Sequence, residues 1–121
     1  MTKFIHDEVL DAPIDKIIAE ADRVIWIDTF SNDYTTITTN AIGSYIPTIT
    51  KANGDTSGRK GTIQASSGIS VDADGTFNHF AVVDDDASKV LYVGEAGASK
   101  PLTVGDTVDA PATDIEFSDP S

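Results

Sequence analysis

Cysteine is absent from the 121 residues of this sequence, and histidine occurs only at His6 and His79. The absence of cysteine excludes disulfides, thiolate zinc sites and cysteine nucleophiles. Two histidines this far apart make a catalytic triad hard to assemble, and neither a G-x-S-x-G elbow nor an H-E-x-x-H motif is present. We therefore predict a non-enzymatic protein with no cofactor and no tightly held metal. A small hydrolase that works through carboxylates or a bound metal is the alternative class.

Long apolar runs are also missing. No stretch approaches the roughly 20 apolar residues of a membrane-spanning helix. The first residues, Met1 to Asp7, lack the apolar centre of a signal peptide. We expect a soluble protein that is made in a cytoplasm and has no membrane partner. The length predicts a single domain over residues 1–121.

Basic residues are scarce: eight Lys and Arg stand against 20 Asp and Glu, and the formal net charge is -12. Such a chain is not expected to bind nucleic acid, because phosphate recognition needs clustered cations. The one basic cluster consists of Lys51, Arg59 and Lys60. We predict that these three residues bind acidic groups of a partner protein or of a neighbouring copy.

The basic cluster lies beside a glycine-rich stretch, residues 54–63 with the sequence GDTSGRKGTI, that suggests a phosphate-binding loop at first sight. The G-x-x-x-x-G-K-[ST] motif is not met, because only three residues separate Gly54 from Gly58 and Arg59 precedes Lys60. A phosphate loop must also lead into a helix, whereas strand-like residues follow this one. The stretch is predicted to be an exposed turn that begins a strand.

One amphipathic helix is predicted near the N-terminus, at about residues 8–21. Pro13 is best tolerated in a first helical turn, so the helix proper is expected to begin near Asp11 or Ala12. We expect the helix to pack against a core that contains Trp26, a residue of the β-branched and aromatic run 23–29. The apolar side chains at helical spacing are those of Val9, Leu10, Ile14, Ile17 and Ile18.

The remainder of the chain has the pattern of an all-β protein. Residues 30–40 are a polar connection with one helical turn around residues 34–37. Short strand candidates separated by turn residues then follow, and their number and spacing predict an antiparallel β-sandwich. The candidates are residues 41–50, 59–65, 68–71, 76–83, 90–95, 107–110 and 113–117.

Two predicted turns are rich in aspartate. They would form a calcium site if they met at one end of the sandwich, because calcium takes six to eight oxygen ligands from flexible loops. The EF-hand pattern is not met, and turns favour aspartate for its local hydrogen bonds, so we expect solvated turns without a metal. The residues concerned are Asp72, Asp74, Asp84, Asp85 and Asp86.

Three segments give the chain a resemblance to a family of small virion structural proteins of tailed phages and prophages. They are residues 54–60, residues 75–85 (GTFNHFAVVDD) and residues 91–93 (LYV). The helix that opens with residues 9–12 and the acidic strand at residues 110–117 also resemble the family, whose members are mostly of unassigned function.

The resemblance implies a non-enzymatic protein located in the virion. It favours a capsid decoration or cement subunit that binds the assembled head in many copies, with the major capsid protein or other virion proteins as partners. The alternative is a tail-associated or fibre-anchoring protein. The sequence does not separate these two locations.

Overall fold

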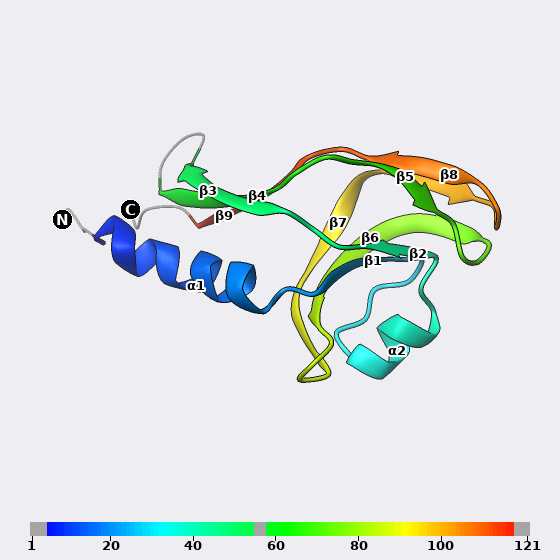
Figure 1. Cartoon of the computed structure of the whole chain (residues 1–121), viewed down its shortest axis with the longest axis horizontal. Helices are drawn as coiled ribbons and strands as arrows, with labels where there is room; N and C mark the ends of the chain where they lie inside the picture. Colours follow the sequence, from blue (N-terminus) through cyan, green and yellow to red (C-terminus); the bar gives the residue numbers. More distant parts are fainter. Residues whose placement is uncertain (1–4, 55–57, 118–121) are drawn as a thin grey trace. The chain divides into compact units, whose positions relative to one another are not determined.

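The computed structural model describes residues 5–54 and 58–117, apart from the side chains of residues 97 and 98. In this part of the chain, antiparallel strands form most of the regular structure, and the first element is a helix (Figure 1). The predicted mainly β, sandwich-like fold with an N-terminal helix is confirmed.

The contacts of the chain define two compact units. The first contains residues 5–19, 48–54, 58–65 and 111–117, and the second contains residues 20–47 and 66–110. Joint folding of both units as one domain over residues 1–121 stays a prediction.

The first unit consists of a three-stranded sheet and most of helix α1 (Asp7–Glu20). The sheet has the order β3-β4-β9 and is antiparallel throughout. Its strands are β3 (Ile49–Asn53), β4 (Arg59–Ile63) and β9 (Thr113–Phe117). The Ile14 Cγ2 atom lies 3.0 Å from the place where a Cβ at position 61 would be, so Gly61 allows α1 to approach β4 closely.

The start of α1 differs from the prediction. The helix begins at Asp7, and Pro13 lies inside it. Because proline has no N–H, the carbonyl of Val9 lacks its usual i+4 donor. Val9 is 63% exposed, and the helix continues through the proline to Glu20.

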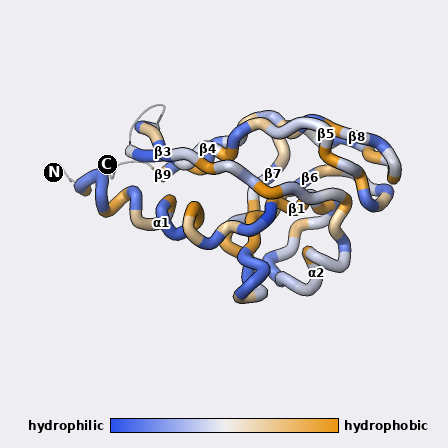
Figure 2. The backbone as a smooth tube through the Cα atoms, in the orientation of Figure 1, coloured by the Kyte–Doolittle hydropathy of each residue, from blue (hydrophilic) through white to orange (hydrophobic). Residues whose placement is uncertain are grey.

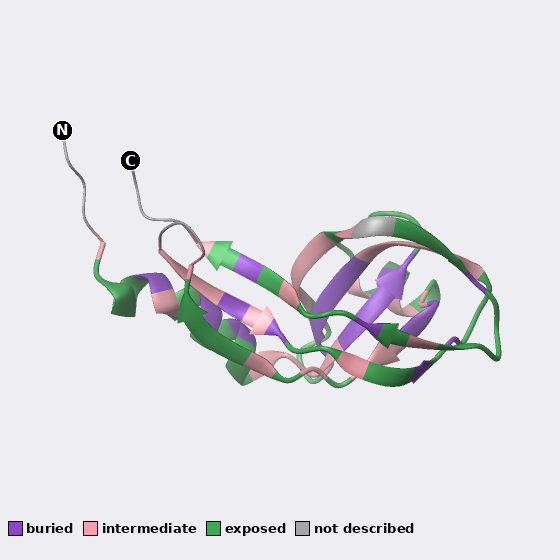
Figure 3. Cartoon of the chain, turned by 90° about the horizontal axis from the view of Figure 1, so that it is seen from above, coloured by how far each residue is buried: buried purple, intermediate pink, exposed green. Residues whose placement is uncertain are grey.

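The buried face of α1 is narrower than predicted. Leu10, Ile14 and Ile17 are buried, whereas Val9 and Ile18 are 63% and 39% exposed. At the helical repeat, these two lie roughly a quarter turn to either side of the buried stripe. Figures 2 and 3 show the mixed hydropathy and the mixed burial along α1.

The second unit contains a four-stranded antiparallel sheet of order β2-β1-β6-β7 and a separate β5-β8 pair. Gly43 of β2 forms an isolated bridge with Val71, directly after β5, which links the two sheets. The strands are β1 (Arg23–Ile27), β2 (Gly43–Tyr45), β5 (Ser66–Ser70), β6 (Gly75–Asp84), β7 (Lys89–Leu102) and β8 (Thr107–Ala110).

Both faces of β1 are buried, which explains its continuous apolar sequence. On one face, Ile25 and Ile27 pack with Ala81, Val83 and Ile37, which belongs to helix α2 (Tyr34–Thr39). On the other face, Trp26 is fully buried and stacks on Phe77, with their ring centroids 4.9 Å apart. The core position of Trp26 is confirmed, and its packing with α1 stays a prediction.

Three other boundaries differ from the predictions. The candidate strand 41–50 is divided into β2 and the start of β3, with Pro47 between them. Strand β7 continues to Leu102, well past the predicted end at residue 95. The predicted helical turn is a full helix, α2 (Tyr34–Thr39), because the carboxylate of Asp33 caps it by accepting a hydrogen bond from the Thr36 N–H at 2.9 Å.

Candidate functional site

Two of the three predicted partner-binding residues lie on the face of the β3-β4-β9 sheet that meets α1. Arg59 donates through Nε to Oδ1 of Asp11 in α1 at 2.7 Å, and through Nη1 to Oδ1 of Asn53 at 2.6 Å. The bond from Arg59 holds the pKa of Asp11 below its usual value, and Asp11 raises the pKa of Arg59.

Lys51 also binds α1. Its Nζ lies 2.8 Å from Oδ1 of Asp15 and 3.7 Å from Oδ2 of Asp11. The hydrogen bond to Asp15 raises the pKa of Lys51. Lys51 and Arg59 therefore share one carboxylate of α1, and together they tie the helix to strands β3 and β4.

Lys60 points to the opposite face of the sheet, because consecutive side chains of a strand alternate. Its Nζ lies 3.1 Å from Oδ2 of Asp114 in β9. The Thr62 hydroxyl donates to Oδ1 of the same carboxylate at 2.8 Å. Thr62 and then Lys60 lower the pKa of Asp114.

The predicted basic cluster is thus divided between two faces, and each member is engaged by the chain's own carboxylates. The side chains of Arg59 and Lys60 keep 18% and 17% exposure, and that of Lys51 keeps 37%. Arg59 and Lys60 belong to β4 and not to an exposed turn. The turn itself is closed by the Gly54 N–H, which donates to the Gly58 carbonyl at 2.9 Å, and Asp55 to Ser57 lie outside the described residues.

The two aspartate-rich turns do not meet. One directly precedes β6 and the other follows it, so the ten residues of this strand separate them by about 30 Å. The condition for a calcium site that combines both turns is therefore not met. Asp74 instead accepts a hydrogen bond from the Val104 N–H at 2.8 Å, and Asp85 is bound by Arg23 and Tyr34.

A smaller acidic group, which the sequence patterns did not indicate, lies at the end of β6. Oxygens of Asp22, Asp84 and Asp86 lie within 4.8 Å of one another. Backbone hydrogen bonds account for this arrangement: Asp84 accepts from the Ala87 N–H at 3.2 Å, and Asp22 accepts from the N–H of Asp85 at 2.8 Å. The carboxylates of Asp22 and Asp84 therefore serve to cap backbone N–H groups of the turn that follows β6.

The two histidines belong to different units. His6 accepts a hydrogen bond at Nδ1 from the Glu8 N–H at 3.1 Å. The His79 ring meets the Phe30 ring edge to face at 5.8 Å between centroids, and its buried Nδ1 has no hydrogen-bond partner among the described residues. The absence of catalysis stays a prediction.

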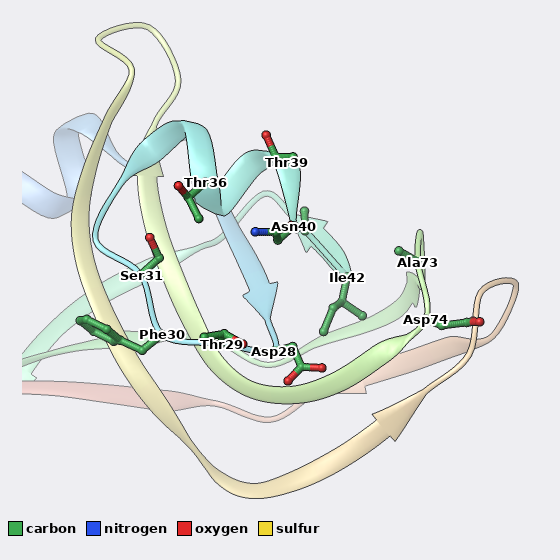
Figure 4. A pocket seen from close by; sticks show the side chains of 11 residues that line it. Asp28, Thr29, Phe30, Ser31, Thr36, Thr39, Asn40, Ile42, Ala73 and Asp74 are labelled. Carbon is green, nitrogen blue, oxygen red and sulfur yellow. The ribbon is translucent and has the colours of Figure 1, made fainter.

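A pocket of about 610 Å³ opens in the second unit, between the end of β1, helix α2 and the turn before β6 (Figure 4). Phe30 lies at one end and Asp74 at the other, with Asp28, Thr39 and Asn40 between them. From the sequence, residues 30–40 were predicted to be a polar connection with one helical turn and no binding role. One signal in the sequence was the aromatic residue Phe30 at the start of a mostly polar run.

Comparison with models of known protein families, with curated proteins and with solved structures gave no match to this chain. The resemblance to virion proteins therefore stays a prediction from the sequence. Among the described residues, no helix is long and apolar enough to cross a membrane.

Proposed function

We propose that the protein is a non-enzymatic structural protein of a tailed-phage virion that binds the assembled head as a decoration or cement subunit. The sequence resemblance in residues 54–60, 75–85 and 91–93 is the observation that carries this proposal. The mainly β architecture supports it, since small β domains can cover the junctions of a lattice in many copies. Avidity from repeated modest contacts then supplies the binding.

The charges of the molecule support one mode of attachment for such a subunit. A chain of net charge -12 repels its own copies, so neighbours on a particle need either distance or a cationic contact. Among the three predicted partner-binding residues, Lys51 is the most exposed. A carboxylate of the major capsid protein could replace Asp15 as its partner, whereas Arg59 and Lys60 are mostly covered.

The test is co-sedimentation with purified, undecorated shells of the phage that encodes the protein. We expect the wild type to sediment with the shells and the Lys51→Gln variant to show reduced occupancy. Lys89→Gln is the matched control, because Lys89 is also a strand lysine of similar exposure that is paired with one carboxylate, Glu20, at 3.0 Å. Equal occupancy of both variants on the shells would mean that Lys51 does not take part in the contact. Absence of wild-type binding to shells would contradict the decoration function.

The pocket of the second unit favours a second candidate, a tail-associated protein whose loops meet the host surface. A protein of this kind would sediment with purified tails and not with heads. The same preparations therefore separate the two candidates.

A further inference from the structure

We propose that the pocket between β1, α2 and the turn before β6 is a binding site for a neutral saccharide. This inference goes beyond the proposed function and does not depend on a location at the head or at the tail. It rests on the hydrogen-bonding groups, the charges and the exposed aromatic ring that line the pocket.

Several polar side chains of the pocket have no hydrogen-bond partner among the residues that the structure describes. The hydroxyls of Thr29 and Thr39 and the amide of Asn40 make no side-chain hydrogen bond within the described ranges, although all three line the pocket. They supply both donors and acceptors. A ligand with several hydroxyl groups can replace the water at all three side chains without a loss of hydrogen bonds.

The two carboxylates of the pocket are fixed, and that of Asp28 has acceptor capacity left. Asp28 accepts from the Thr76 N–H at 3.0 Å, and Asp74 accepts through one oxygen from the Val104 N–H at 2.8 Å. A carboxylate has about four lone-pair sites, so Asp28 can accept further hydroxyl donors. The Asp74 carboxylate points away from Asp28 in Figure 4 and contributes its charge at the edge of the pocket. The orientation of both carboxylates is set before binding, which lowers the entropy cost of binding a ligand.

The charge of the pocket selects against anions. Among the described residues, its lining contains Asp28 and Asp74 but neither lysine nor arginine. Phosphate, carboxylate and sulfate groups would be repelled and would find no cationic partner. Nucleotides and acidic sugars are therefore disfavoured, and neutral polyhydroxyl compounds remain.

Phe30 provides the apolar part of the site. Its side chain is 58% exposed, and the edge-to-face contact with His79 holds the ring in place. A pyranose ring carries C–H groups on its faces and hydroxyls around its rim. It can therefore cover the exposed aromatic ring while its hydroxyls reach Thr39 and Asn40.

The experiment is an NMR titration of the ¹⁵N-labelled full-length chain. The neutral probes are the methyl glycosides of glucose, galactose and mannose, together with N-acetylglucosamine and lactose. The charged probes are glucose 6-phosphate and glucosamine. We expect at least one neutral sugar to give saturable shifts at the amides of residues 28–31 and 36–42, with weaker binding of glucose 6-phosphate.

Two variants locate the binding. Phe30→Ala and Asn40→Ala should each weaken it about three- to tenfold, the loss expected for one aromatic contact or one hydrogen bond. Thr35→Ala is the control, because Thr35 is an exposed α2 residue that does not line the pocket. Spectra of all variants must match the wild type away from the site.

Three results would overturn the proposal. The first is the absence of saturable shifts with every neutral sugar. The second is binding of glucosamine alone, which would assign the two carboxylates to an amine ligand. The third is binding that both Phe30→Ala and Asn40→Ala leave unchanged.

Discussion

Arg23 and Asp85 form a two-point ion pair that joins the start of β1 to the turn after β6. Nε of Arg23 lies 2.8 Å from Oδ2 of Asp85, and Nη2 lies 2.9 Å from Oδ1. The Tyr34 hydroxyl donates to the same Oδ1 at 2.6 Å, and this bond connects helix α2 to the ion pair. One carboxylate thus links three elements of the second unit.

Asp85→Asn should destabilise the second unit by about 1–2 kcal/mol. The substitution removes the charge and places an amide donor against the donors of Arg23. Hydrogen bonds between charged groups contribute up to about 3 kcal/mol. The expected loss is smaller here, because both side chains are about one-third exposed and water screens their attraction. Chemical denaturation measures the loss. Asp86→Asn is the control, since its side chain is exposed and removal of a charge beside Asp22 and Asp84 relieves repulsion.

Stability should fall in acid. Arg23 lowers the pKa of Asp85, Arg59 lowers that of Asp11, and Thr62 with Lys60 lowers that of Asp114. A depressed carboxyl pKa contributes stability above the unfolded value of about 3.9, and this contribution is lost as pH falls through the folded pKa. Urea titrations should therefore show decreasing stability below about pH 4. Asp85→Asn should show a smaller decrease, and equal pH profiles would contradict this role of Asp85.

Gly94→Ala should destabilise the larger sheet. Gly94 lies opposite Phe80, and a Cβ there would come within 2.6 Å of the Phe80 ring. Overpacking of this kind costs about 1–3 kcal/mol. Thermal unfolding of the single variant and of Gly94→Ala with Phe80→Leu tests the cause, because the smaller side chain should recover part of the loss. A double variant without recovery would assign the loss to the backbone.

Most secondary structure was predictable because its periodicity is local. The apolar spacing of α1 and the alternating runs of the later strands identified these elements. The start of α1 was not predictable, because proline is best tolerated in a first helical turn, whereas Pro13 lies inside this helix. The sequence patterns did not indicate the two compact units that the contacts define.

The candidate site was predictable only in part. A strand beginning at Arg59 already implies that Arg59 and Lys60 point to opposite faces. Their partners were not predictable, because Asp11 lies 48 residues from Arg59 and Asp114 lies 54 residues from Lys60. The pocket depends on the pairing of β1 with β6, which brings Asp28 beside the turn at Asp74.

Arg59→Glu should destabilise the first unit more than Lys60→Glu. The first change places a carboxylate beside Asp11, whose side chain is only 14% exposed, and removes the bond to Asn53. The second change acts on Asp114, which is one-third exposed and keeps the Thr62 hydroxyl. Thermal unfolding of the two variants measures which substitution lowers the stability more. A larger loss for Lys60→Glu would contradict the assignment of the helix-binding role to Arg59.

Ile17→Asp and Ile18→Asp should differ sharply, although the two residues are neighbours. Ile17 is 7% exposed, so the substitution removes a core side chain and buries an unpaired charge. The expected loss of about 3–5 kcal/mol is comparable with the whole stability of a small domain. Ile18 is 39% exposed, so its substitution should cost no more than about 1 kcal/mol. Part of this cost arises because an acidic residue near a helix C-terminus is unfavourable.

Circular dichroism melting curves of both variants give the comparison. Wild-type melting of Ile17→Asp would mean that α1 does not pack on the β3-β4-β9 sheet in solution, and that the N-terminal segment is an arm able to reach a neighbouring subunit.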